Sequence, residues 1–372
     1  MSLGIPVRDL RAVGARFVVH GTLRHAVAHG SGHINETYAA TYDQAGRDVR
    51  YIHQRINGDV FRQPERLMDN VARVLAHAAV RLDGLPDASR RTLTLVPARD
   101  GRPFIVDEAG AVWRTYLFIE RATTFDIVES TGQAEAAARA FGQFQAVLAD
   151  LPGTRLHDTI PDFHNTRRRY DSCVAAVEAD PCNRAARARA EIALALAREG
   201  DVDRLLAAAA AGTLRERVTH NDTKLNNVMI DEVTGEALCV VDLDTTMPGL
   251  VAYDFGDMVR TATNAAAEDD PDPTRVRSRP EMFEAIARGY LSTAGAFLTP
   301  AEIETLAFGG RLIALEQAIR FLADYLQGDT YYRVAHPEHN LQRARAQFAL
   351  VQSLEQQHDA YERIVRRYAA GT

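Results

Sequence analysis

Hydrophobic and polar positions alternate over short runs in the first 120 residues of the chain. These runs are rich in β-branched and aromatic residues, and glycine-containing turns separate them, which is typical of strands. The predicted strands are residues 17–19, 23–28, 34–42, 49–56, 93–96, 104–106 and 112–119. One amphipathic helix is predicted over residues 64–82, with Pro64 in its first turn. The pattern predicts an antiparallel sheet with one helix over residues 1–120.

The spacing of apolar residues changes to a helical period from Thr131 onward. The predicted helices are residues 133–148, a segment beginning at 161–163, and residues 183–198, 202–211, 281–294, 300–326 and 341–368. A β-hairpin interrupts them, with strands at 228–230 and 238–241 around a Thr234-Gly235 turn. We therefore expect an α+β protein with two domains, residues 1–120 and a larger, mostly helical 121–372.

Composition narrows the class of protein. The chain has 372 residues, of which 46% are hydrophobic and 25% charged, as in globular proteins. Its net charge of −7 gives no basic footprint for nucleic acid, and no apolar run reaches the ~20 residues of a membrane span. The N-terminal residues lack a secretory signal, and three cysteines match no zinc site. We expect a cytoplasmic protein with reduced thiols and no nucleic-acid or membrane partner.

Polar residues with a regular order surround the hairpin. His220 and Asp222 are followed by Asn227, the hairpin then leads to Asp242, and Asp254 opens an apolar helical run. Phosphoryl transfer needs a carboxylate to accept the hydroxyl proton and a cation held against the phosphates. Asp222 is the candidate base, and Asn227 and Asp242 are candidate Mg²⁺ ligands because both offer hard oxygen atoms. Asp and Asn also favour ordinary turns, but two motifs in this order favour the chemical interpretation.

The order His-x-Asp-x-x-x-x-Asn, then apolar-apolar-Asp, resembles the catalytic and metal motifs of the protein-kinase-like superfamily. The form of these motifs in this chain is similar to that of the aminoglycoside and choline phosphotransferase branch. The resemblance implies a bilobal protein-kinase-like fold and the use of ATP and Mg²⁺. It also implies that Lys224 reaches the γ-phosphate and that Asp254 braces the catalytic loop. A solvent-facing Lys224 is the alternative.

The residues that flank these motifs resemble the N-acetylhexosamine 1-kinases more specifically. The flanking sequences are THNDTKLNNVM and VVDLDTTMPGLVAYDFGD. That resemblance implies an amino-sugar substrate phosphorylated at its anomeric hydroxyl. Choline, homoserine, an aminoglycoside and another sugar remain open as acceptors. The single tryptophan argues against an aromatic cage for choline.

The turn formed by Gly30, Ser31 and Gly32 resembles the glycine-rich flap that covers ATP phosphates in this superfamily. A plain hairpin turn is the alternative. Phe118 and Ile119 occupy the expected hinge position, where they would flank the adenine or serve only as strand residues.

The third strand lacks the usual lysine that contacts the phosphates. Arg55 is the natural cationic substitute for this lysine, although its planar guanidinium differs from the point charge of a lysine. An arginine that only faces solvent is equally consistent with the sequence. Glu65 and Asp69 of the helix are the candidate acids for this cation. Both also suit a helix N-terminus.

Five residues are candidates for binding the acceptor: His33, His164, Arg320, Asp329 and Tyr331. Arg320 with Asp324 also fits an ordinary ion pair along one helix face, and His164 also fits a structural hydrogen bond. A catalytically inactive relative that only binds a nucleotide or a protein is the second hypothesis. Only the missing lysine supports that hypothesis, since the base and both metal ligands are intact. The sequence does not indicate the oligomeric state.

Overall fold

The computed structural model describes residues 9–30, 34–125 and 127–371. The chain forms two compact units. Unit 1 contains residues 1–123, 150–161 and 229–247, and unit 2 contains residues 124–149, 162–228 and 248–372. The sequence-based division at residue 120 assigned 150–161 and 229–247 to the second domain, whereas here they pack with the first unit.

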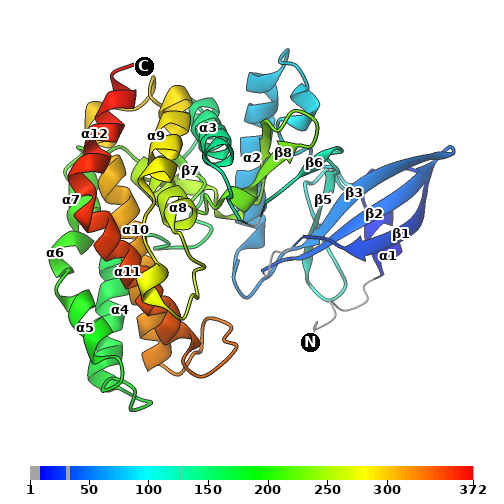
Figure 1. Cartoon of the computed structure of the whole chain (residues 1–372). Coiled ribbons are helices and arrows are strands. Elements are labelled where there is room, and N and C mark those ends of the chain that lie inside the picture. Colours follow the sequence, from blue (N-terminus) through cyan, green and yellow to red (C-terminus); the bar gives the residue numbers. More distant parts are fainter. Residues whose placement is uncertain (1–8, 31–33, 126, 372) are drawn as a thin grey trace. The chain divides into compact units, whose positions relative to one another are not determined.

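Unit 1 is built on a five-stranded antiparallel sheet with the strand order β1-β2-β3-β5-β4. The strands are β1 (Thr22–Ala28), β2 (Glu36–Gln44), β3 (Arg47–Arg55), β4 (Ile105–Val106) and β5 (Val112–Leu117). Figure 1 shows β1, β2 and β3 as a long twisted ribbon. The two-residue turn between β2 and β3 has positive φ at Ala45 and Gly46, which matches the twist of an antiparallel hairpin.

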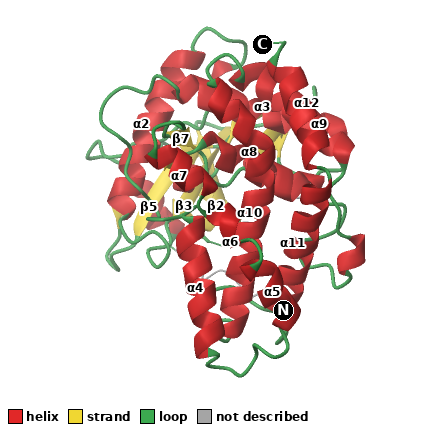
Figure 2. Cartoon of the chain, turned by 90° about the vertical axis from the view of Figure 1, so that its left-hand side faces the viewer, coloured by secondary structure: helices red, strands yellow, loops and turns green. Residues whose placement is uncertain are grey.

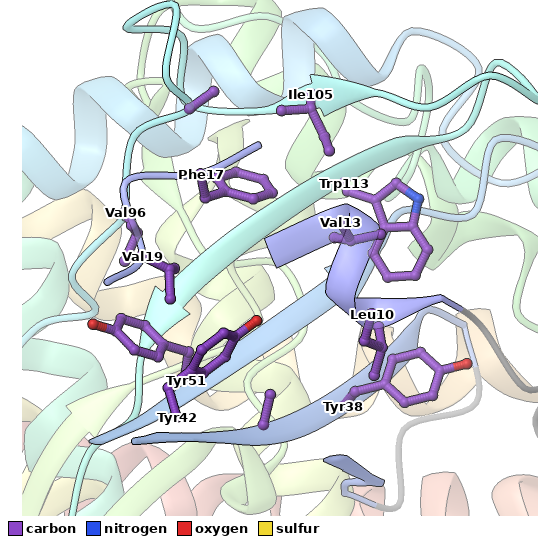
Figure 3. Packing of buried hydrophobic residues seen from close by; sticks show 12 residues of the cluster. Leu10, Val13, Phe17, Val19, Tyr38, Tyr42, Tyr51, Val96, Ile105 and Trp113 are labelled. Atoms are coloured by element: carbon purple, nitrogen blue, oxygen red, sulfur yellow. The ribbon is translucent and has the colours of Figure 1, made fainter. Parts of the chain in front are cut away.

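One face of this sheet is covered by a helix that the sequence pattern did not predict. Helix α1 (Leu10–Ala15) is capped by the Asp9 carboxylate, which accepts hydrogen bonds from the N–H groups of Arg11 and Ala12. Figure 3 shows how Leu10 and Val13 pack with aromatic residues of the strands, including Trp113. Phe17, predicted as part of a strand, makes only an isolated bridge to Ala98.

Helix α2 (Pro64–Leu82) begins and ends at the predicted residues. Its Asn70 side chain is fully buried and donates hydrogen bonds to the backbone oxygens of His157 (2.8 Å) and Thr246 (3.1 Å). The Asn70 amide oxygen accepts a bond from the His157 N–H (2.9 Å). One buried side chain thus contacts both the 150–161 and the 229–247 segments of unit 1.

A smaller sheet completes unit 1. It has the order β6-β8-β9, formed by β6 (Ala122–Thr123), β8 (Val228–Asp231) and β9 (Ala237–Val240). Strands β8 and β9 are the predicted hairpin. The predicted strand at 93–96 is wrong, because only Leu95 bridges to Tyr116 there.

Unit 2 is mostly helical (Figure 2). Its helices are α3 (Thr131–Leu148), α4 (Thr166–Ala179), α5 (Arg189–Leu196), α6 (Glu199–Val202), α7 (Arg204–Ala210), α8 (Val251–Thr263), α9 (Pro280–Ala294), α10 (Pro300–Leu326), α11 (His339–Gln356) and α12 (His358–Ala369). The predicted helix over 341–368 is two helices, separated at Gln357. Strands β7 (Arg217–Thr219) and β10 (Met247–Gly249) form a two-stranded sheet.

Glycines allow α8 and α10 to pack with their backbones close together. A Cβ atom on Gly256 would lie 2.4 Å from the backbone oxygen of Gly309, so a larger residue does not fit there. The close contact fixes α8, whose first turn carries Asp254. In the described part of the chain, no helix is long and apolar enough to cross a membrane.

Candidate active site

The loop between β7 and β8 carries His220, Asn221 and Asp222, and a buried carboxylate holds its backbone. The Asp254 carboxylate accepts hydrogen bonds from the N–H groups of His220 (2.9 Å) and Asn221 (2.7 Å) and from the Gln145 amide (2.6 Å). Asp254 is fully buried, and this burial raises its pKa despite nearby His220 and the hydrogen bonds. The prediction that Asp254 braces the catalytic loop is confirmed.

Asn221 adopts a left-handed backbone conformation, with φ of 64°, directly before the candidate base. Its side-chain oxygen accepts a hydrogen bond from the Thr219 hydroxyl (3.1 Å). A non-glycine residue with this φ is held there by its surroundings, and such residues cluster at functional sites. The conformation turns the chain sharply before Asp222.

Asp222 forms an ion pair with Lys224, with 2.9 Å between Oδ1 and Nζ. The two side chains are 22% and 47% exposed, so this pair is reachable from solvent. Burial works to raise the pKa of Asp222, but the Lys224 ammonium, its hydrogen bond, His220 and Arg260 outweigh burial and lower it. The carboxylate is therefore ionised at neutral pH and can accept a proton.

Asn227 lies beside the candidate base. Its amide nitrogen donates to the backbone oxygen of Asp222 (2.9 Å). Because that bond uses the nitrogen, the amide oxygen is the atom that suits a hard cation. Asn227 thus fits the ligand role that the sequence assigned to it.

Asp242 follows strand β9 in unit 1 and is also left-handed, with φ of 59° and ψ of 57°. A carboxylate is a ligand that Mg²⁺ prefers. This ion needs only one or two protein carboxylates, because water and phosphate oxygens complete its coordination shell. Within the described residues there is no group of three or more His, Cys, Asp or Glu side chains placed to hold a metal ion by themselves.

Arg55 makes a different contact from the one expected of a phosphate-binding cation. Its guanidinium donates to Glu36 of the neighbouring strand (2.8 Å). The acid expected from the helix is engaged elsewhere, since Asp69 contacts His157 (3.2 Å) and Arg73 (3.8 Å). Nothing in these contacts orients Arg55 toward a nucleotide.

The buried cation of unit 1 is Arg114, which the sequence analysis missed. Its side chain is 1% exposed and pairs with Asp244, and its Nε donates to the Gln54 amide oxygen (2.8 Å). Asn35 donates a further hydrogen bond to Asp244 (2.6 Å). The signal in the sequence was an arginine inside the apolar run VWRTYLFI, where a charge needs a buried partner.

The residues expected around the adenine lie together in unit 1. The Arg50 guanidinium stacks over the Phe118 ring, 3.7 Å from its centroid. The His29 ring packs edge-on against the same Phe118 ring, with 5.6 Å between the two ring centroids. Ile119 is buried. Gly30 has a φ of 81°, which favours glycine. Ser31, Gly32 and His33 lie outside the described residues.

His164 is tied to the catalytic loop. Its ring bonds to the Glu316 carboxylate (2.9 Å, Nδ1) and to the backbone oxygen of Asn221 (3.2 Å, Nε2). Burial is the largest influence and lowers its pKa, but the Glu316 carboxylate, Asp257 and the Asn221 backbone together outweigh burial, and the net shift is upward. These contacts favour the structural hydrogen bond named as an alternative, with His164 positioning the loop.

Arg320 lies among aromatic rings. Its guanidinium is 6.0 Å from the ring centroid of Phe163, 5.9 Å from Tyr331 and 5.6 Å from Tyr332, and it donates to the neutral Gln317 amide (3.2 Å). The expected pairing with Asp324 is wrong. Asp324 instead accepts hydrogen bonds from the N–H groups of residues 330–332, at 2.7 to 2.9 Å.

Asp329, a candidate for binding the acceptor, is engaged by neighbouring side chains of unit 2. Its carboxylate pairs with Arg184 (2.6 Å) and accepts a hydrogen bond from Asn340 (2.9 Å). Its side chain is only 6% exposed. Asp329 therefore anchors the loop that carries Tyr331.

A model of the phosphotransferase enzyme family (APH) matches residues 25–302. The chain belongs to this family. It is therefore a phosphotransferase, and the resemblance to the aminoglycoside and choline phosphotransferase branch is confirmed at the level of the family.

Solved structures share its fold at low sequence identity. An aminoglycoside phosphotransferase from Alicyclobacillus acidocaldarius is 14% identical, with a TM-score of 0.59 over 99% of this chain and 98% of that one. A choline/ethanolamine kinase family protein from Mesorhizobium loti is 16% identical, with a TM-score of 0.53 over 96% and 99%. A spectinomycin phosphotransferase solved with ADP and spectinomycin is 13% identical, with a TM-score of 0.52 over 95% and 99%. These likenesses confirm the protein-kinase-like fold class.

Proposed function

We propose that this phosphotransferase moves the γ-phosphate of ATP to a hydroxyl group of a small molecule, with Asp222 as the general base. The observation that carries the proposal is the state of Asp222. Its carboxylate pairs with the Lys224 ammonium, is partly exposed and is held on a loop that Asp254 fixes. A base must be reachable by the hydroxyl and unprotonated, and the partial exposure of Asp222 and its ion pair with Lys224 support this role.

In the proposed reaction the acceptor hydroxyl gives its proton to the Asp222 carboxylate as its oxygen bonds to the γ-phosphorus. The bond from that phosphorus to the bridging oxygen breaks, and ADP leaves. Lys224 neutralises charge on the γ-phosphate once it leaves its pair with Asp222. Asn227 and Asp242 would hold Mg²⁺, which when bound neutralises phosphate charge.

For the nucleotide, we propose that the turn at Gly30, Ser31 and Gly32 covers the phosphates and that Phe118 and Ile119 flank the base. The packing of His29 against Phe118 supports this, because it brings the start of the turn to the hinge position. Arg55 stays a weaker candidate, since its contact is with Glu36.

For the acceptor, we propose the anomeric hydroxyl of an N-acetylhexosamine, GlcNAc or GalNAc, giving the sugar 1-phosphate. The resemblance of the flanking sequences supports this choice. Arg320 and Tyr331 are the side chains proposed to contact the sugar, together with His33. Arg320 suits that role because its hydrogen bond in unit 2 goes to a neutral carboxamide.

The test is to incubate the protein with Mg-ATP and, separately, GlcNAc, GalNAc, galactose, choline, homoserine and kanamycin, and to follow the products by phosphorus NMR. We expect an anomeric phosphate signal with GlcNAc or GalNAc. A phosphomonoester formed only with choline, homoserine or kanamycin would contradict the sugar assignment. No turnover with any compound would support the inactive alternative.

A further inference from the structure

Unit 2 contains a cavity of about 520 Å³ that the motif analysis did not identify. Its walls come from the catalytic loop, from α8 and the loop that follows, and from α11. The polar residues that line it are Lys224, Asn226, Arg260, Thr261, Asn264, Glu268, Arg279 and Gln347. Because Nζ of Lys224 is 2.9 Å from the Asp222 carboxylate, the cavity reaches the proposed base.

Arg260 is already neutralised. It pairs with Asp257 (2.9 Å) and Glu268 (2.7 Å), and its own side chain is only 8% exposed. A guanidinium with two carboxylate partners offers little net charge to an anionic ligand.

The other two cations in the wall are engaged as well. Lys224 pairs with Asp222, and the Arg279 guanidinium donates to backbone oxygens of residues 262–264, at 2.9 to 3.3 Å. Arg260 and Arg279 therefore belong to the framework, whereas Lys224 stays available for the γ-phosphate of ATP. Neither arginine makes the cavity a site for an anionic acceptor.

The unsatisfied groups in the wall are oxygen atoms. Asn226 Oδ1 and Gln347 Oε1 are buried and have no hydrogen-bond partner among the described residues. Gln347 lies on α11 with only 1% of its surface exposed. Buried acceptors normally find a donor, so these two oxygens point to a ligand that carries O–H or N–H groups.

We propose that this cavity binds part of the acceptor substrate, and that Asn226 and Gln347 select a neutral molecule rich in hydroxyl or amide N–H groups. These contacts add to those proposed for Arg320 and Tyr331, which do not line the cavity. This inference rests on the proposed function. A quaternary ammonium such as choline has no N–H to give to the two oxygens. None of the described residues that line the cavity is aromatic, so a cation–π site for choline is not formed here either.

The test compares Gln347→Met with the wild type, and with Gln352→Met as the matched control. Methionine keeps the length of glutamine but removes the acceptor oxygen. Gln352 is exposed on the same helix. We expect Gln347→Met to raise KM for the acceptor about 10-fold, in line with losing one hydrogen bond. KM for ATP and kcat should stay within about 2-fold, and Gln352→Met should resemble the wild type in all three constants.

An unchanged acceptor KM in Gln347→Met would overturn the inference. So would equal losses in acceptor KM, ATP KM and kcat together with a lower melting temperature, because these indicate a purely structural glutamine. The kinetics use whichever hydroxyl compound the protein phosphorylates. A KM effect with galactose but no N-acetylhexosamine turnover would refute the amino-sugar assignment and keep this inference.

Efficient use of choline with no effect of Gln347→Met would refute this inference and keep phosphoryl transfer. If the protein turns over no compound, titration calorimetry of the same compounds in the presence of ADP decides the matter. Binding of a sugar that Gln347→Met weakens supports the cavity assignment, and absence of sugar binding contradicts it.

Discussion

Two ion pairs, one in each unit, differ in how far they are exposed to solvent. Arg114 and Asp244 of unit 1 are 1% and 3% exposed, whereas Lys224 and Asp222 of unit 2 are 47% and 22% exposed. The first pair is closed to solvent and has further hydrogen bonds from its own unit. In the second pair, each side chain can give up the other and bind water or substrate instead. The comparison separates charges that hold a framework from charges available for chemistry.

The difference follows from the cost of burying charge. A buried pair needs good geometry and extra hydrogen bonds, and removing one partner leaves an uncompensated charge. A half-exposed pair gains little stability, because water screens it. Lysine also suits the second pair, since its ammonium is a mobile point charge, while the arginine fork suits the fixed one.

The largest effect is expected for Arg114→Met. The variant leaves the Asp244 carboxylate buried without its cation, so we expect the free energy of unfolding to fall by about 3–5 kcal/mol. Urea unfolding measures the change. The double variant Arg114→Met/Asp244→Leu should recover most of the loss, because neither charge remains. A loss below about 1 kcal/mol in the single variant would show that the pair is not a closed framework contact.

A second buried group of unit 1 should make stability depend on pH. His53 is fully buried between the Tyr42 hydroxyl (2.9 Å) and the Thr115 hydroxyl (2.8 Å), and burial lowers its pKa from 6.5 to about 4. As pH falls below 6.5 the unfolded state takes up this proton first. Stability should therefore be full above pH 6.5 and decline by up to about 3 kcal/mol toward pH 4.

Unfolding measured across this pH range tests the assignment. A His53→Gln variant should lose that part of the pH dependence, whereas His20→Gln, at an exposed position, should keep it. An identical pH profile in His53→Gln and the wild type would assign the effect to other groups.

The smallest effect on stability is expected for Lys224→Met. Because Lys224 is half-exposed, the free energy of unfolding should change by less than about 1 kcal/mol. The ammonium lowers the pKa of Asp222, so its removal should raise that pKa and move the acid limb of kcat/KM to higher pH. The pH–rate profile shows the shift. An acid limb that stays in place would mean that Lys224 does not tune the base.

Periodicity predicted α2 to the residue, because a proline start and one apolar stripe define it locally. It missed α1, whose six residues are too short to show a period. It joined α11 and α12, because the interruption at Gln357 is a backbone change within a continuous helical pattern. The packing of 229–247 with unit 1 rests on contacts between residues far apart in the sequence, such as Asn70 with Thr246 and Arg114 with Asp244, which no local pattern encodes.

The catalytic loop was predictable because its residues follow one another in a short, ordered motif. Asp254 was found for the same reason. Arg55 and Asp329 were chosen by residue type, and their partners turned out to be Glu36 and Arg184. Gln347 was missed because a single glutamine in an amphipathic helix carries no signal until packing places it in a cavity wall.

The most direct measurement is single-turnover phosphate transfer by Asp222→Ala with saturating Mg-ATP and acceptor, with nucleotide binding measured in parallel by calorimetry. We predict that the rate falls at least ~10²-fold while ATP binding is largely kept, as expected for the loss of a general base. A rate near that of the wild type would contradict the role of Asp222 and, with it, the mechanism proposed for this phosphotransferase.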